Sequence, residues 1–263
     1  MTDDADPSAR RVLVTGGTRG LGRAIAVRFL RAGADVVVCG RTEPERPIGA
    51  DGRDATFVAA DLRDPDEVWR LVAAANESLG GIDVLVNNAG GAPPAVTAEA
   101  SPRFTEKIIA LNLLAPLWCA QAVYPLMTEQ IGGGVILNIA SVSGTRANPL
   151  GAAYGAAKAG LLNLTQTLAV EWGPQVRVVA LTVGYVVTDG AELHYGDDAG
   201  LAAVGERLAM KRMGTPDEVA DLCAFLASPA AGWITGTSID IHGGGEVPGY
   251  LEASTADVNR NPS

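Results

Sequence analysis

The feature that most constrains this chain of 263 residues is a regular alternation of short apolar runs with longer amphipathic stretches. The short runs are rich in β-branched residues and apolar almost throughout, which is typical of strands buried on both faces of a sheet. The longer stretches carry the period of helices, and strand–helix–strand repeats of this kind build a parallel sheet. We therefore predict a single doubly wound α/β domain, with an about seven-stranded parallel sheet and helices on both faces.

The boundaries of these elements follow from the pattern. The predicted strands cover residues 12–15, 35–39, 56–59, 84–86, 135–139, 176–181 and 238–241. The predicted helices cover residues 20–32, 65–79, 101–127, 151–172 and 216–226.

No linker or repeat divides the chain, so one domain is expected over residues 11–245. Residues 1–10 are predicted to be a flexible leader, and residues 246–263 a loosely ordered tail without an apolar period. Residues 41–54 are polar and rich in proline and glycine, which predicts a loop. Residues 189–214 are rich in alanine and glycine with a helical middle, which predicts a mobile lid after the sixth strand.

Composition excludes several classes of protein. Hydrophobic residues make up 48% and charged residues 19%, which suits a large core and excludes disorder and coiled coil. The net charge of −10 argues against nucleic acid or an anionic membrane surface as the main partner. The first residues do not resemble a signal peptide, and no uninterrupted apolar run approaches ~20 residues. We therefore expect a soluble, cytoplasmic protein.

Cysteine and histidine are scarce. Cys39, Cys119 and Cys223 are too few and too scattered for a disulfide framework, which indicates a reducing compartment. His194 and His242 are the two histidines of the chain, and no Cys-x-x-Cys is present, so no metal site is predicted.

A glycine-rich loop follows the first predicted strand, with the sequence Thr15-Gly16-Gly17-Thr18-Arg19-Gly20-Leu21-Gly22. Glycines at a strand-to-helix junction allow a tight turn and let a pyrophosphate approach the positive end of the helix. The spacing differs from G-x-G-x-x-G, and no Lys-Ser/Thr follows as in a P-loop. A plain glycine-rich turn is the alternative for this loop taken alone.

Further motifs follow in order along the chain. They are Asp61-Leu62 after the third strand, Asn87-Asn88-Ala89-Gly90 after the fourth, Asn112, Ser141 after the fifth, and Tyr154-x-x-x-Lys158. Together with the glycine loop, these motifs resemble the short-chain dehydrogenase/reductase family over residues 10–245, in particular its 3-oxoacyl reductase and ketoreductase members. The resemblance implies a Rossmann fold and an oxidoreductase that moves hydride between a nicotinamide and a carbonyl or carbinol carbon.

The resemblance also implies the residues of the site. The catalytic set would be Asn112, Ser141, Tyr154 and Lys158. The cofactor-binding set would be Gly16, Thr18, Arg19, Gly20, Leu21, Gly22, Arg41, Asp61, Leu62, Asn88, Ala89, Gly90, Tyr154, Lys158, Gly184, Val186 and Thr188.

Tyr154 and Lys158 are four residues apart and therefore share one face of a helix. A nearby ammonium favours the phenolate, so we expect Lys158 to lower the pKa of Tyr154 toward the useful range. Ser141 would hold the substrate oxygen, with Ser143 as the rival and a turn cap as the alternative role. In the family, Asn112 would hold a water that links the lysine to solvent.

Two positions depart from the family pattern. Val183 stands where a proline is expected, which predicts a less rigid turn around Gly184 and Thr188. His242 replaces the acid of the closing D-G-G strand, and we interpret it as structural.

Cofactor preference is predicted from the end of the second strand. NAD-preferring members carry an acid there, whereas this chain has Gly40-Arg41, and Arg19 would lie on the same side of the ribose. Two guanidiniums can bind a 2′-phosphate through charge-assisted hydrogen bonds, so we expect NADP(H) to be preferred over NAD(H). A solvated loop residue is the alternative role for either arginine.

The expected substrate is a ketone or secondary alcohol of largely hydrophobic character, such as an acyl, polyketide-like or steroid-like compound. The lid offers apolar candidates for the pocket wall: Leu193, His194, Tyr195, Leu201, Val204 and Met210. Alternatives are an NAD-dependent alcohol dehydrogenase of a degradative pathway, a non-catalytic NADP(H)-binding regulator, and a redox-neutral lyase, epimerase or isomerase.

The two longest predicted helices carry more leucines than one sheet-facing stripe requires. The residues are Leu111, Leu114, Leu117, Leu161, Leu162, Leu164 and Leu168. The surplus predicts a helix-on-helix interface in a homodimer or homotetramer.

Overall fold

The structure, a computed structural model, describes residues 10–250, apart from the side chains of Leu193 and His194. Its strands are β1 (Arg11–Val14), β2 (Asp35–Gly40), β3 (Gly49–Ala50), β4 (Arg53–Asp54), β5 (Thr56–Ala59), β6 (Val84–Asn87), β7 (Gly134–Ser141), β8 (Val176–Val183) and β9 (Ser238–Ile241). Its α-helices are α1 (Gly20–Arg31), α2 (Pro65–Leu79), α3 (Pro102–Ile109), α4 (Ala115–Glu129), α5 (Ala152–Trp172), α6 (Glu192–Tyr195), α7 (Asp198–Glu206) and α8 (Pro216–Ala227).

Seven strands form one sheet in the order β5-β2-β1-β6-β7-β8-β9, and every neighbouring pair is parallel. The chain builds outward from β1 in one direction and then returns to place β6 on the other side of β1. This reversal between β1 and β6 is the position where open parallel sheets bind their ligands. The predicted doubly wound fold and its seven strands are confirmed.

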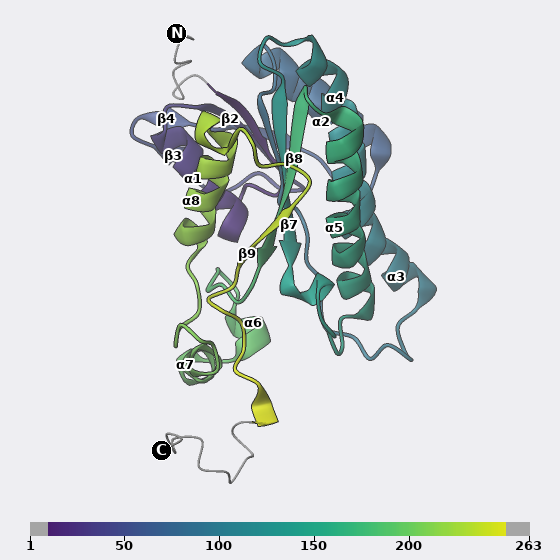
Figure 1. The fold of residues 1–263 in the computed structure, drawn as a ribbon, viewed down its shortest axis with the longest axis vertical. Helices are drawn as coiled ribbons and strands as arrows, with labels where there is room; N and C mark the ends of the chain where they lie inside the picture. The colour runs from purple at the N-terminus through teal and green to yellow at the C-terminus, as the bar shows by residue number, and fades with distance from the viewer. Residues whose placement is uncertain (1–9, 251–263) are drawn as a thin grey trace, which may run out of the picture.

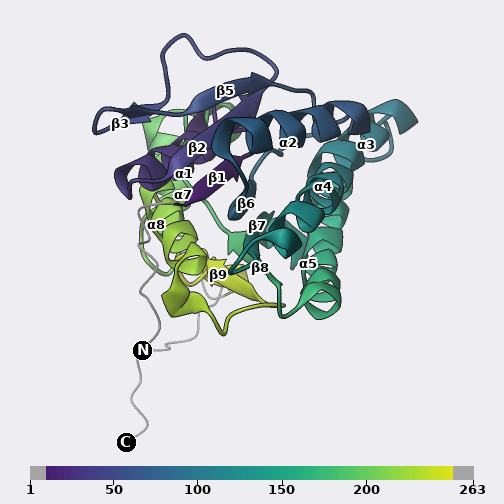
Figure 2. The same ribbon diagram turned by 90° about the horizontal axis from the view of Figure 1, so that it is seen from above.

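Successive residues of each strand face opposite sides of the sheet, and both sides are covered (Figures 1 and 2). Val12 and Val14 of β1 pack in a core with α1 and α8, while Leu13 packs in a second core with α2, α4 and α5. This burial on both faces is the physical reason that the strands are apolar throughout rather than alternating.

The structure corrects two predicted elements, and in the lid it finds the helical middle that was predicted. Residues 41–54, predicted as a loop, contain the antiparallel hairpin β3–β4, whose flanking Ile48 is buried in the core beneath α1. The predicted helix over residues 101–127 is interrupted by a π-helical turn, Ala110–Leu114. The lid over residues 189–214 holds two short helices, α6 and α7, beyond the carboxyl edge of the sheet (Figure 1).

The predicted tail begins later than expected. Glu246 bridges to Leu208, and the Val247 amide donates to the Arg207 carbonyl at 2.8 Å, so this part of the predicted tail is fastened to the lid. Residues 1–9 of the predicted leader and 251–263 of the predicted tail lie outside the described residues.

Within residues 10–250, one helical stretch, Pro102–Glu129, is long and apolar enough to cross a membrane, with a mean hydropathy of 1.4 over an 18-residue window. In the fold it occupies a core position. Cys119, Val123 and Met127 are completely buried against the sheet beside α2, which accounts for the apolar sequence.

Candidate functional site

The predicted site residues gather at the carboxyl edge of the sheet. The glycine loop leaves β1, Asn88-Ala89-Gly90 leave β6, and Ser141 ends β7. Gly184, Val186 and Thr188 follow β8. Parallel strands end at the same edge, so residues far apart in sequence are brought together there.

The glycine loop is shaped by close backbone contacts. Gly16 and Gly20 have positive φ angles of 64° and 52°, a conformation that favours glycine. A methyl group at Gly22 would lie 2.3 Å from the Gly16 carbonyl oxygen and 2.3 Å from Asn88 Nδ2. Only a residue without a side chain fits at Gly22, so the loop is packed tightly against the segment after β6.

Helix α1 begins at this loop without a side-chain cap. Helices α4, α5 and α6 also lack one, whereas α2, α3, α7 and α8 begin with a capping side chain, from Asp64, Ser101, Asp197 and Thr215 respectively. The first N–H groups of a helix need acceptors, and an uncapped N-terminus beside a glycine turn suits an anionic group.

Thr15 and Asn88 join the loop to the end of β6. The Thr15 hydroxyl accepts hydrogen bonds from the backbone N–H groups of Asn88 and Ala89, each at 3.0 Å. The Asn88 amide donates to the carbonyls of Thr15 and Gly16, at 2.9 and 3.2 Å. We call the space between the glycine loop (residues 15–22) and residues 88–90 the cradle. The Asn88 side chain therefore fixes the shape of the cradle.

Arg19 and Arg41 flank one end of the cradle. Thr18 packs on Gly40, since a methyl group added to Gly40 would lie 3.1 Å from the Thr18 hydroxyl. Arg19 and Arg41 directly follow these two contacting residues in the chain, and both are exposed. Within residues 10–250, neither arginine forms an ion pair at 4.0 Å or less. Their guanidiniums are available for an anionic ligand.

Asp61 lies close to this end of the cradle. It forms an ion pair with Arg63, which lowers the pKa of Asp61 below its usual value, and the charge of Arg41 adds to that effect. Leu62 is buried in the core below. The carboxylate of Asp61 is thus already occupied by the arginine beside it.

The segment after β8 forms the opposite wall of the cradle. A methyl group on Gly20 would come 3.7 Å from Thr188 Cβ, so Thr188 faces the glycine loop. Gly184 is required because a side chain there would lie 2.5 Å from His242 Cβ. Val186 bridges to Gly214, which ties this segment to the end of the lid.

Val183 continues β8 where the family pattern has proline. It pairs with Ser141 on one side and with Ile241 on the other, and the Gly184 N–H donates to the Ile241 carbonyl at 3.0 Å. The strand ladder therefore holds the start of this turn. The lower rigidity expected from the missing proline stays a prediction.

Tyr154 lies in the first turn of α5 and Ser141 at the end of β7. The Ser141 hydroxyl accepts the Ser143 N–H at 3.1 Å and lies near enough to the phenol of Tyr154 to act on its pKa. Ser143 instead lies against α5, where its carbonyl oxygen would be 2.9 Å from a methyl group on Gly155. Of the two rival serines, Ser141 is the one that acts on the tyrosine.

Lys158 is 3% exposed, and its Nζ donates to the Ile139 carbonyl at 2.7 Å. The Nζ atom lies 5.6 Å from the centre of the Tyr154 ring. Burial lowers the pKa of Lys158 to about 8. This lysine therefore changes charge near neutral pH, which surface lysines do not.

Asn112 sits in the π-helical turn and is completely buried. Its amide oxygen accepts the Gly91 N–H at 2.9 Å, and its Nδ2 donates to the carbonyls of Gly91 and Ile108. A methyl group on Gly90 would lie 2.7 Å from Asn112 Oδ1 and 3.3 Å from Lys158 Nζ. Asn112 and Lys158 therefore both face the side of Gly90 where another residue would carry its side chain, and glycine leaves that space free.

The predicted lowering of the Tyr154 pKa is wrong for this structure. Burial raises the pKa of Tyr154, and the Ser141 hydroxyl opposes that rise in part. Lys158 directs its Nζ to the Ile139 carbonyl and is itself shifted toward its neutral form. Burial disfavours the charged form of both groups.

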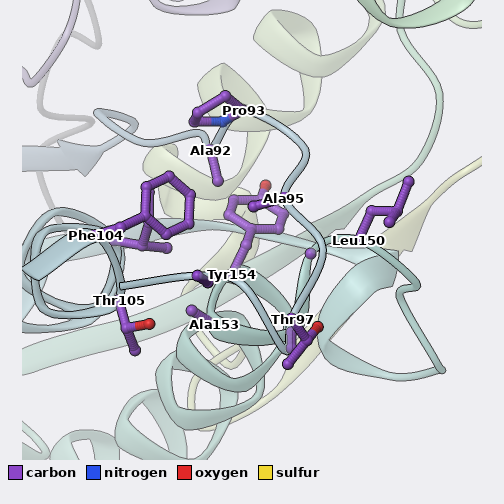
Figure 3. A pocket seen from close by; sticks show the side chains of 13 residues that line it. Ala92, Pro93, Ala95, Thr97, Phe104, Thr105, Leu150, Ala153 and Tyr154 are labelled. Atoms are coloured by element: carbon purple, nitrogen blue, oxygen red, sulfur yellow. The ribbon is translucent and has the colours of Figure 1, made fainter. Parts of the chain in front are cut away.

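An apolar pocket of about 130 Å³ opens beside Tyr154 (Figure 3). Its wall comes from the loop after β6 (Ala92, Pro93, Ala95), from Phe104 of α3, and from Leu150. Sequence analysis missed these residues and placed the wall in the lid instead. The run Gly91-Ala92-Pro93-Pro94-Ala95 directly after the Asn-Asn-Ala-Gly motif was the available signal.

The lid candidates are placed differently. Met210 lines a separate cavity with His242, between β9 and α8. Tyr195 packs edge-on against Tyr185 with 5.7 Å between ring centres. Leu201 and Val204 are half-buried in α7 and line neither cavity. Leu193 and His194 lie outside the described side chains.

No group of three or more histidine, cysteine or acidic side chains within residues 10–250 is arranged to hold a metal ion. The donor set at the carboxyl edge suits a dinucleotide instead. Glycines leave room for a pyrophosphate beside an uncapped helix, two unpaired guanidiniums lie at one end, and a phenol and a buried ammonium lie at the other.

Comparison with known proteins agrees with this geometry. A family described as enoyl-(acyl carrier protein) reductase matches residues 16–246. The chain belongs to the short-chain dehydrogenase/reductase family. It is an oxidoreductase of that family, whose members use NAD(P) cofactors and act on small-molecule substrates.

Individual relatives cover most of the chain. An uncharacterized oxidoreductase of Mycobacterium tuberculosis is 38% identical, over 88% of this chain and 90% of the relative. A 3-oxoacyl-[acyl-carrier-protein] reductase of Synechocystis sp. is 36% identical, over 90% and 97%. The ligand-free structure of the Thermoplasma acidophilum aldohexose dehydrogenase matches with a TM-score of 0.84 and 31% identity, over 91% and 95%.

Replacing Lys158 by methionine should change how stability depends on pH. The folded-state pKa of about 8 lies below the ordinary value of 10.5, so the unfolded chain binds more protons between these values. As the pH rises from about 8 to about 10.5, the free energy of unfolding of the wild type should therefore increase relative to that of Lys158→Met. Urea denaturation at a series of pH values measures the difference.

The matched control is Lys107→Met, which removes an exposed lysine from α3. It should leave the pH dependence of stability close to that of the wild type. A constant stability difference between wild type and Lys158→Met across this range would contradict the lowered pKa.

Proposed function

We propose that this protein reduces ketones to secondary alcohols with NADPH. The observation that carries the proposal is the arrangement of Ser141, Tyr154 and Lys158 on one side of the cradle and the unpaired Arg19 and Arg41 at the other end. The similarity to a 3-oxoacyl-[acyl-carrier-protein] reductase supports the carbonyl-reducing direction.

The cofactor would be held by the chain's own groups. The glycine loop and the first N–H groups of α1 would bind the pyrophosphate, and Arg19 and Arg41 the 2′-phosphate. Gly90, Lys158 and Thr188 would lie along the nicotinamide half. The bound nicotinamide would supply the hydride.

The residues around Tyr154 would manage the proton. The raised pKa of Tyr154 keeps its phenol protonated at neutral pH, so it would donate that proton to the carbonyl oxygen of the substrate. The Ser141 hydroxyl would hold the same oxygen. Lys158, with a pKa of about 8, could return a proton to the phenolate, and buried Asn112 would keep the segment at Gly91 in place.

A largely hydrophobic substrate is supported by the pocket wall of alanine, proline, phenylalanine and leucine beside Tyr154. We also propose a cytoplasmic location. Within the described residues all three thiols are free and buried, which fits a reducing compartment.

Tyr154→Phe should lower turnover by ~10²-fold or more, because it removes the proton donor while keeping the ring. Consumption of NADPH with a panel of ketones measures the effect. Tyr124→Phe is the matched control, since Tyr124 stacks on Trp172 with 4.5 Å between ring centres. Near-wild-type kcat in Tyr154→Phe would contradict the mechanism.

Arg41→Ala should raise the KM for NADPH by tenfold or more, because one charge-assisted contact contributes roughly 1.5–3 kcal/mol. Use of NADH should stay almost unchanged. Arg53→Ala is the control, because Arg53 lies in the neighbouring hairpin and pairs with Asp35. Tighter binding of NADH than NADPH by the wild type would overturn the assignment and favour an NAD-dependent dehydrogenase.

The proposed assembly is a homodimer or homotetramer through α4 and α5. Leu161 and Leu168 of the predicted surplus are buried, and Leu111 and Leu164 pack on the core. Leu114, Leu117 and Leu162 remain half-exposed. We expect light scattering at micromolar concentration to give a mass of at least two chains, and the mass of a single chain would contradict the interface.

A further inference from the structure

Three chain segments are joined by one polar cluster at the carboxyl edge. Arg146 Nη2 donates to Glu246 Oε1 at 2.5 Å and to the Tyr185 hydroxyl at 2.9 Å. The Tyr185 hydroxyl in turn donates to Glu246 Oε1 at 2.7 Å, and the Arg146 guanidinium lies 6.0 Å from the centre of the Tyr185 ring. The cluster therefore has a single ion pair at its centre.

This cluster stands beside the reacting residues. Arg146 follows Ser141 by five residues, on the segment that continues through Leu150 of the apolar pocket to Tyr154. Tyr185 comes two residues after Val183, the strand partner of Ser141. Its ring packs on Tyr195, whose pKa is raised by burial and, to a smaller extent, by Tyr185 and Tyr154, while Arg146 lowers it. The pair therefore lies on the segments that border Ser141, Tyr154 and the apolar pocket.

The Glu246 carboxylate is held in place by backbone pairing. The Val247 N–H donates to the Arg207 carbonyl at 2.8 Å, and the Ala209 N–H donates to the Gly245 carbonyl at 3.1 Å. These bonds on both sides of Glu246 fix it to the lid. Its negative charge is thus a built part of the site's edge rather than the end of a free tail.

The two side chains of the ion pair are 39% and 37% exposed, for Arg146 and Glu246 respectively. At this exposure the pair contributes little to stability. The pair matters instead for the local charge, because the Glu246 carboxylate neutralises the Arg146 guanidinium from a different segment of the chain. A carboxylate on a substrate would need to compete with Glu246 for the same guanidinium.

We propose that the Arg146–Glu246 pair determines whether neutral or anionic ketones reach Tyr154. With the pair intact, the edge of the site is electrically balanced and neutral ketones are favoured. Without the Glu246 charge, Arg146 is free to bind the carboxylate of an oxo acid. This inference rests on the proposed ketone reductase activity and names the feature that selects its substrates.

The test compares two oxo esters with their free acids. The shorter pair is ethyl 4-oxopentanoate and 4-oxopentanoate, and the longer pair is ethyl 7-oxooctanoate and 7-oxooctanoate. The readout is the ratio of kcat/KM for acid to that for ester, because a variant that only loosens the fold lowers both. We expect Glu246→Gln to raise this ratio by about tenfold, the order expected for one unit charge near the substrate in a partly solvated cleft. Arg146→Gln should lower it, and 0.5 M salt should weaken both effects.

Asp221→Asn is the matched control. It removes one negative charge from the ion pair between Arg28 of α1 and Asp221 of α8. It should leave the ratio unchanged. An unchanged ratio in Glu246→Gln, or an equal rise in Asp221→Asn, overturns the inference while leaving the proposed activity standing. Absence of turnover of every ester by the wild type overturns both.

Discussion

The pairing of β1 with β6 is the constraint on which the site depends. Helices and strands wind outward in both directions from this pair, so the ends of β1 and β6 open into a crevice. The Thr15 hydroxyl and the Asn88 amide close the floor of that crevice with four hydrogen bonds to backbone groups. The glycine loop can then turn tightly because its carbonyls already have donors.

A second polar connection runs through the interior and fixes α5 against the sheet. Asn87 Nδ2 donates to Asn138 Oδ1 at 2.9 Å, and Asn138 Nδ2 donates to the Thr165 hydroxyl at 2.9 Å. Buried amides accept few alternative partners, so this chain of bonds specifies the register of the helix on the strands. Tyr154 and Lys158 lie on the same helix, and their positions at the carboxyl edge follow from that register.

Much of this could be predicted from sequence, because apolar runs of strand length alternating with helical patterns favour a parallel sheet, and the Tyr-x-x-x-Lys pair stands in the order of motifs of a known family. The hairpin at residues 49–54 was missed although Asp51-Gly52, both at positive φ, is typical of a hairpin turn, because its two strands are only two residues long and carry no alternating pattern. The pocket wall at Ala92, Pro93 and Phe104 was missed because it depends on where a loop lies rather than on a periodic pattern. The lowered pKa expected for Tyr154 failed because burial acts on both members of the pair, an effect that spacing does not reveal.

That joint burial has a consequence for the direction of proton transfer. A tyrosine whose pKa is raised holds its proton at neutral pH, and it is therefore ready to act as an acid toward a carbonyl oxygen. Removing a proton from an alcohol would require the phenolate, which burial disfavours and rising pH restores. The Lys158 ammonium loses its own proton above about pH 8, so it helps the phenolate least where the phenolate is most needed. Near neutral pH the phenol is therefore in the protonated state that reduction of a carbonyl requires, while its raised pKa makes it a weaker acid than a free tyrosine.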